Sequence, residues 1–199
     1  MTERCNDEWG KAEWRASLTG SRTAVSVQRG VLEARALAEA VRGLMLPETV
    51  CCYVPFGSEP GSVALLDVLR GARARVLLPV IPPEPGPLDW AEYTGTGALV
   101  PGRLRGVLEP SGPRLGPSAL GSAGLVLLPA LAVDHAGVRL GRGAGYYDRS
   151  LVHAGPETAL VAVVRDDELV ERLPAEAHDV RMTGALTPGR GLVPLPAGM

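Results

Sequence analysis

The segment RLGRGAGYYD, residues 139–148, concentrates backbone freedom and charge in one short stretch. Its three glycines alternate with other residues, and Arg139 and Arg142 add positive charge beside them. Glycine lets a backbone approach a ligand closely, and arginine makes charge-assisted hydrogen bonds to phosphate oxygens. Asp148, directly after two tyrosines, could hold a Mg²⁺ ion that bridges phosphates. This combination favours nucleotide binding.

The glycine spacing alone leaves a second interpretation open. The segment is neither G-x-x-x-x-G-K-[ST] nor G-x-G-x-x-G, so it matches neither the Walker loop nor the dinucleotide-binding fingerprint. A glycine turn whose arginine and aspartate form a surface ion pair would have the same composition. The elements around the segment must therefore decide whether it faces a ligand.

Those elements alternate along the chain. Four apolar, β-rich runs predict buried strands over residues 49–56, 75–81, 124–133 and 158–165. Helices are predicted over residues 8–20, 29–46, 62–72 and about 146–155. Strands that are apolar on both faces and alternate with helices indicate an α/β fold with a mostly parallel sheet covered on both sides. Residues 82–122, rich in proline and glycine, predict loops with one or two short strands.

The predicted helix over residues 29–46 shows the clearest periodicity. Apolar residues recur at intervals of three and four, namely Val31, Ala34, Leu37, Ala38, Val41 and Leu44. In parallel sheets ligands bind beyond the carboxyl ends of the strands. Residues 139–148 are expected there, directly after the central strand 124–133 and before a helix.

Composition excludes several classes of function. The 199 residues carry a net charge of −2, so we expect neither a nucleic-acid nor a membrane partner. No apolar run approaches the roughly 20 residues of a membrane helix, and the N-terminus lacks a signal-peptide core. His135 and His153 lack zinc-site spacing, and the adjacent Cys51 and Cys52 are expected to be buried thiols on opposite faces of a strand. We expect one cytoplasmic domain over residues 1–199, acting as a monomer.

The string LLPALAVDHAGVRLGRGAGYYDRSL, residues 127–151, closely resembles the signature of the 5-formyltetrahydrofolate cyclo-ligase family. That family carries an apolar strand with a proline, then Asp and Gly, then R-L-G-x-G-x-G-Y-Y-D. Further segments resemble other motifs of the family in the expected order: KAEWR (11–15), YVPFGSEPGS (53–62), GVLEP (106–110) and LPAEAHDVRMTGALTP (173–188). Together these segments span nearly the whole chain.

The resemblance implies ATP-dependent conversion of 5-formyltetrahydrofolate to 5,10-methenyltetrahydrofolate, with release of ADP and phosphate. Phosphorylation of the formyl oxygen would make it a good leaving group, and N10 would then close the ring. Phosphoryl transfer requires mainly positioning and charge neutralisation, which suits a chain without an evident nucleophilic triad. The resemblance also implies a three-layer α/β/α fold, as in sugar-phosphate isomerases and coenzyme A transferases.

The resemblance further assigns roles to individual residues. The implied ATP-binding residues are Lys11, Arg15, Arg139, Leu140, Gly141, Arg142, Gly143, Ala144, Gly145, Tyr146 and Tyr147, with Lys11 and Arg142 catalytic through charge stabilisation. The implied folate contacts are Val54, Glu59 and Tyr146, and the implied Mg²⁺ ligands are Asp148 and Asp179. Glu59 is expected at a strand end opposite the phosphate loop.

Simpler interpretations of some of these residues stay open. Lys11 and Arg15 lie one turn apart on a predicted helix, and they could form a solvated face. Val54 could be strand core, and Asp179 could be an ordinary loop carboxylate.

Two alternative functions also stay open. A phosphosugar enzyme of the same superfamily would suit a lone glycine-rich loop, whereas the ordered set of motifs favours the cyclo-ligase. A non-catalytic folate- or nucleotide-binding paralogue would have no reason to retain Lys11, Glu59, Arg142, Asp148 and Asp179 together.

Overall fold

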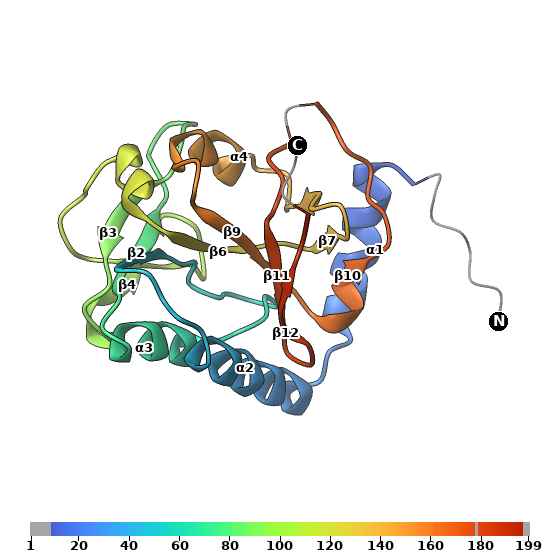
Figure 1. The fold of residues 1–199 in the computed structure, drawn as a ribbon, viewed down its shortest axis with the longest axis horizontal. Coiled ribbons are helices and arrows are strands. Elements are labelled where there is room, and N and C mark those ends of the chain that lie inside the picture. Colours follow the sequence, from blue (N-terminus) through green and yellow to red (C-terminus); the bar gives the residue numbers. More distant parts are fainter. Residues whose placement is uncertain (1–8, 178, 197–199) are drawn as a thin grey trace.

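The computed structural model describes residues 9–177 and 179–196, and it shows a large central sheet flanked by helices (Figure 1). The sheet has seven strands in the order β12-β11-β9-β6-β1-β2-β3. The strands are β1 (Thr49–Cys51), β2 (Arg75–Val80), β3 (Asp89–Glu92), β6 (Leu125–Pro129), β9 (Ala159–Val163), β11 (Gly184–Thr187) and β12 (Gly191–Pro194). The five inner strands are parallel, and β3 and β12 run antiparallel at the edges.

Both faces of the sheet are buried, as the apolar runs predicted. In β6, Leu125 and Leu127 belong to one core cluster, and Val126 and Leu128 belong to the other. Helices α2 (Val27–Arg42) and α3 (Val63–Gly71) cover the first face (Figure 1). Helix α4 (Tyr146–Ser150) and the 3-10 turns Pro117–Ser122 and Leu151–His153 cover the second face. The predicted α/β class with a mostly parallel sheet is confirmed.

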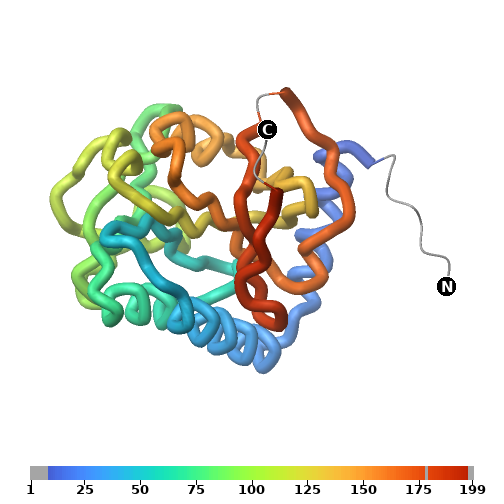
Figure 2. Tube along the Cα trace, viewed as in Figure 1, coloured from blue at the N-terminus to red at the C-terminus, as the bar shows by residue number. Residues whose placement is uncertain are grey.

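The N-terminal helix lies on a smaller sheet. Strands β10 (Leu169–Val170), β7 (Ala132–Asp134) and β8 (Arg139–Leu140) form this sheet. Helix α1 (Lys11–Thr23) packs Trp14 and Leu18 against it, and the tube in Figure 2 shows the helix beside these segments. This packing carries the residues at the start of α1 toward the end of β8.

Several predicted boundaries were wrong. The run 124–133 is two strands, because Pro129 has no N–H for a further ladder bond and the chain then leaves the large sheet for β7. The glycine-rich loop therefore follows β8 rather than the central strand. In α2, Val31 is 64% exposed and does not belong to the buried stripe.

The region of residues 82–122 contains more structure than predicted. It holds β3, the hairpin of β4 (Leu99–Pro101) and β5 (Leu108–Pro110), and 3-10 turns. In the part of the chain that the structure describes, no helix has the length and apolar character needed to cross a membrane.

Candidate functional site

A cavity of about 180 Å³ opens beyond the carboxyl ends of β1, β2 and β6. Its apolar wall comes from the loop after β1, the ends of β2 and β6, the residue before β3, and the β4–β5 hairpin. These residues include Val54, Phe56, Pro79, Ile81, Leu88, Leu104, Val107, Leu108 and Pro129. The glycine-rich loop and Glu59 add the polar part of the lining. This is the edge of the sheet at which a ligand was expected.

The glycine-rich loop connects β8 to α4. Gly143 and Gly145 have φ angles of +96° and +71°, which residues with a side chain adopt only with strain. Helix α4 has five residues, shorter than the predicted helix over about 146–155. A helix this short has a small dipole, so the loop's N–H groups and arginines are its main means of attracting an anion.

Arg139 and Asp148 pair across this loop. Arg139 Nη2 lies 2.6 Å from an Asp148 carboxylate oxygen, and the two side chains are 6% and 48% exposed. The Arg139 guanidinium also lies 5.7 Å from the centre of the Tyr147 ring. The sequence alone left open a glycine turn whose arginine and aspartate form an ion pair, and this ion pair is present. Both of its members also line the cavity.

Glu59 and Arg142 meet at the cavity. Arg142 Nε lies 3.2 Å from Glu59 Oε1, and the Arg142 guanidinium lies 5.0 Å from the centre of the Phe56 ring. The expectation that Glu59 lies opposite the phosphate loop was therefore wrong. The loop between β1 and α3 folds over the carboxyl edge of the sheet and brings the carboxylate to Arg142. Burial raises the pKa of the Glu59 carboxyl, and the nearby Arg142 charge offsets part of this rise.

Lys11 and Arg15 approach the glycine-rich loop from α1. Arg15 Nε donates to the carbonyl oxygen of Gly141 at 3.0 Å, and its guanidinium passes beside Gly143. Lys11 Nζ lies 2.9 Å from Asp179 and 3.0 Å from Glu176. Burial lowers the pKa of Lys11, but the bonds to these two carboxylates outweigh it and leave the pKa raised. Neither cation lies on a wholly solvated face.

The two proposed metal ligands have different surroundings. Asp148 lines the cavity and is half-exposed, whereas Asp179 is held by Lys11 and is not among the lining residues. Asp148 and Asp179 could bind the same ion only if the strand that precedes Asp179 lay beside β6. Strand β9 does lie beside β6. Over residues 9–177 and 179–196, no three His, Cys, Asp or Glu side chains are grouped as they would be around a metal ion.

The other predicted residues also take defined places. Val54 is buried and lines the cavity. The cavity is also lined by Tyr146, Tyr147 and the loop residues Gly141, Gly143, Ala144 and Gly145, which are partly or fully exposed. The Leu140 side chain packs in the cluster under α1, and its carbonyl oxygen accepts the N–H of Leu131. The Leu140 side chain is thus directed into the core instead of the cavity.

Sequence reasoning missed several residues of the cavity wall. Phe56, the chain's one phenylalanine, is the last residue of the apolar run 49–56, so its position at a predicted strand end was a usable signal. Arg22 is 3% exposed and lines the cavity from α1, but a lone arginine in a helix gave no such signal. Leu104 and Leu108 come from a hairpin whose short strands have little periodicity.

Comparison with known proteins gives a consistent result. The model of the 5-formyltetrahydrofolate cyclo-ligase family matches residues 7–188. A 5-formyltetrahydrofolate cyclo-ligase from Mycolicibacterium smegmatis is 50% identical over 192 residues, covering 93% of this chain and 97% of the relative. The Escherichia coli K12 protein of the same name is 32% identical over 149 residues, covering 74% of this chain and 81% of the relative.

Solved structures agree with these sequence matches. The NMR structure of Aquifex aeolicus 5,10-methenyltetrahydrofolate synthetase superposes with a TM-score of 0.75 at 26% identity. The match covers 95% of this chain and 94% of the other.

Proposed function

Because the chain belongs to the 5-formyltetrahydrofolate cyclo-ligase family, we propose that it converts 5-formyltetrahydrofolate and ATP to 5,10-methenyltetrahydrofolate, ADP and phosphate. The contact between Arg142 and Glu59 carries this proposal. It joins the glycine-rich loop, which suits phosphates, to a buried carboxylate in an apolar cavity, which suits a pterin ring. Both substrates can therefore meet at one point.

The folate is assigned to the apolar side of the cavity. Glu59 is 8% exposed and its second carboxylate oxygen accepts the Phe56 N–H at 3.3 Å, so its orientation is fixed. A fixed carboxylate can accept hydrogen bonds from pterin N–H groups. Val54 and Tyr146 supply further contacts with the ring system.

The triphosphate is assigned to the glycine-rich loop and α1. Residues 139–147 offer backbone N–H groups and two guanidinium groups, and Arg15 and Lys11 add positive charge from the helix. Of these, Arg142 is 43% exposed and free to turn toward a phosphate, so it is the preferred group for stabilising the transferred phosphoryl. Lys11 shares this catalytic role in the proposal.

The ring closure follows from that transfer. Once the formyl oxygen carries the phosphoryl group, N10 attacks the formyl carbon, loses its proton, and phosphate leaves with the former formyl oxygen. Exclusion of water by Phe56 and the hairpin leucines protects the activated carbon.

The carboxylates are suited to Mg²⁺, which takes oxygen ligands and usually retains several waters. Asp148 fits because its side chain is half-exposed and lies beside the phosphate loop, and Asp179 is assigned as a second ligand next to Lys11. When bound, the ion would neutralise phosphate charge. Each carboxylate would exchange a cationic side-chain partner for the metal.

We infer in addition that the chain is one cyclo-ligase domain that acts as a monomer in the cytoplasm, on small molecules rather than on nucleic acid or membranes. The family match over residues 7–188 and the net charge of −2 support this inference.

An absorbance assay tests the proposed function. Purified protein is mixed with 5-formyltetrahydrofolate, ATP and Mg²⁺, and the near-ultraviolet absorbance of the methenyl product is followed. Product should form only when both nucleotide and divalent metal are present. Product without nucleotide, or no product with any nucleotide, would contradict the proposal and favour a binding-only paralogue.

A further inference from the structure

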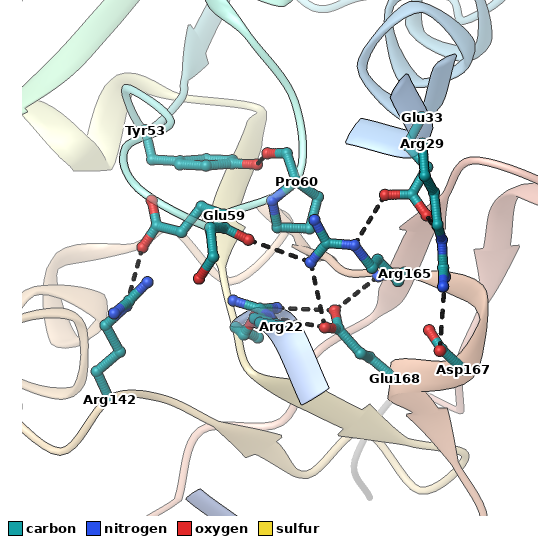
Figure 3. A network of polar contacts seen from close by, with 12 residues as sticks. Arg22, Arg29, Glu33, Tyr53, Glu59, Pro60, Arg142, Arg165, Asp167 and Glu168 are labelled. Atoms are coloured by element: carbon teal, nitrogen blue, oxygen red, sulfur yellow. Dashed lines mark hydrogen bonds and ion pairs between the residues drawn. The ribbon is translucent and has the colours of Figure 1, made fainter. Parts of the chain in front are cut away.

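A network of buried charges lies between α1, α2 and the segment after β9, and one of its members, Arg22, also lines the cavity (Figure 3). Arg22, Arg165 and Glu168 are 3%, 4% and 4% exposed. Arg22 Nε and Nη2 lie 2.6 and 2.7 Å from the two Glu168 carboxylate oxygens, and Glu168 Oε2 also accepts the backbone N–H of Arg165 at 2.8 Å. Burying such charges is costly even when they are paired, so we expect this network to have a role at the cavity.

Arg165 connects this network to the folate side of the cavity. Its Nε lies 2.8 Å from Glu33 Oε2 on α2, and its Nη1 lies 3.4 Å from Glu168 Oε1. The same Nη1 donates at 3.1 Å to the carbonyl oxygen of Ser58, the residue directly before Glu59. The Arg165 side chain is 5% exposed and does not line the cavity. It touches the loop of Glu59 from behind.

The loop of residues 56–60 also has hydrogen bonds of its own. Gly57 has a φ of +59°, and the turn is closed by the bond from Glu59 N–H to the Phe56 carbonyl oxygen at 3.2 Å. The Tyr53 hydroxyl donates to the Pro60 carbonyl oxygen. These bonds are local in sequence, whereas Arg165 ties the loop to β9 and α2.

We propose that Arg165 is a positioning residue: its bond to Ser58, aimed by Glu33 and Glu168, holds the 56–60 loop so that the Glu59 carboxylate faces the cavity. The inference rests on the proposed role of Glu59 as a folate contact. It implies that Arg165 acts on folate affinity through Glu59, without touching folate, and leaves ATP affinity unchanged.

The variant Arg165→Lys tests this role. A lysine ammonium keeps the positive charge beside the two glutamates, but it cannot reproduce the forked geometry that reaches Ser58 at the same time. Loss of that hydrogen bond should raise the Kd for 5-formyltetrahydrofolate, measured by equilibrium dialysis without ATP, by roughly fivefold to tenfold. The ATP Kd should not change.

Arg29→Lys is the matched control. Arg29 pairs with the same Glu33 at 2.6 Å, but its side chain is 49% exposed, and its ion pairs are with Glu33 and Asp167, outside the 56–60 loop. The same chemical change at this position should leave the Kd for 5-formyltetrahydrofolate as it is. A rise equal to that of Arg165→Lys would overturn the proposal, because it would show a general effect of the network.

A double-mutant cycle with Glu59→Gln separates positioning from general stability. If Arg165 acts through Glu59, Arg165→Lys should add nothing to the folate Kd once Glu59 is glutamine. If Glu59→Gln alone leaves the folate Kd unchanged, the proposed role of Glu59 fails. If Glu59→Gln weakens binding and the two effects multiply, the role of Arg165 is overturned.

Glu33→Gln replaces Arg165→Lys in the same cycle if the lysine variant does not fold. It keeps the arginine but removes the charge that aims it, so a smaller rise in folate Kd is expected, again lost in the Glu59→Gln background. The proposal would be contradicted if Glu33→Gln left the folate Kd unchanged. It would also be contradicted if the effects of Glu33→Gln and Glu59→Gln on the folate Kd multiplied in the double variant.

Discussion

Arg142 Nε lies 3.2 Å from Glu59 Oε1, so a residue of the glycine-rich loop touches a residue of the loop after β1. The two side chains differ in freedom, because that of Arg142 is 43% exposed and that of Glu59 is 3% exposed. The carboxylate is thus held in place while the guanidinium can turn. In the proposed function, this pair marks the border between the folate and phosphate halves of the site.

Glu59→Gln should impair folate binding more than ATP binding. The change removes a charge-assisted acceptor of pterin N–H groups, at a cost of roughly 1.5–3 kcal/mol. Steady-state kinetics with each substrate varied in turn should show the larger rise in KM for 5-formyltetrahydrofolate. Glu157→Gln, at an exposed position, is the control. Equal rises in both KM values would place Glu59 outside the folate site.

The raised pKa of Glu59 predicts a pH dependence of stability. In the folded protein its carboxyl binds a proton more readily than at the ordinary pKa of 4.5, because burial disfavours the charged form. Its contribution to the free energy of unfolding is therefore most favourable at low pH and declines as the pH rises above 4.5 through the raised pKa.

Urea unfolding of the wild type and of Glu59→Gln across this pH window measures the effect. The variant should lose less stability than the wild type as the pH rises through this window, because glutamine does not titrate. Parallel pH profiles for the two proteins would show that Glu59 titrates alike in the folded and unfolded states.

Gly143→Ala should weaken ATP binding. Its φ of +96° is unfavourable for alanine by about 1–2 kcal/mol, and the new Cβ would lie 3.5 Å from the Arg15 guanidinium. The loop should shift to relieve the strain, raising the KM for ATP. Gly20→Ala, within α1 and with open space around it, should instead stabilise the protein by up to about 1 kcal/mol. An unchanged KM for ATP in Gly143→Ala would remove the loop from the phosphate site.

The two carboxylates should act on one ion. Asp148→Asn and Asp179→Asn should each raise the Mg²⁺ concentration needed for half-maximal activity. The loss of activity in the double variant, expressed as a free energy, should be smaller than the sum of the losses in the two single variants. Activity is titrated against Mg²⁺ for all three proteins. If Asp179→Asn titrates as the wild type does, Asp179 serves only as the partner of Lys11, and Asp148 alone stays a candidate ligand.

The buried cysteines should be unreactive in the folded protein. Burial raises the pKa of the Cys51 thiol to about 12, and it raises that of Cys52 as well. Cys5 lies outside the described residues, so the test uses Cys5→Ser. A disulfide reagent at pH 8 should label no thiol until urea unfolds the chain. Rapid labelling without urea would show that the strand β1 opens.

The arrangement of the sheet could be predicted where burial imposes a pattern on the sequence. Strands such as β6 and β9 are apolar on both faces because helices cover both, and this is visible as continuous apolar runs in the sequence. Cys51 and Cys52 lie in opposite core clusters as their adjacency on a strand required. Strands β11 and β12 were missed, and β3 was expected only as one of the unplaced short strands of residues 82–122, because each is four residues long and carries little periodicity.

The candidate site was predictable only in part, for a related reason. The glycine-rich loop is continuous in sequence, so its residues were found together. Contacts between distant segments, such as Arg142 with Glu59 and Arg165 with Ser58, depend on how loops fold over the sheet edge. No local pattern encodes them, and the expected separation of Glu59 from the loop was wrong for this reason.

Transfer of the formyl oxygen tests the central claim most directly. 5-Formyltetrahydrofolate labelled with ¹⁸O in the formyl group is incubated with the protein, ATP and Mg²⁺, and the released phosphate is analysed by mass spectrometry. If the protein phosphorylates the formyl oxygen before N10 closes the ring, each phosphate released carries one ¹⁸O atom. Unlabelled phosphate, with the ¹⁸O recovered in water, would contradict the account.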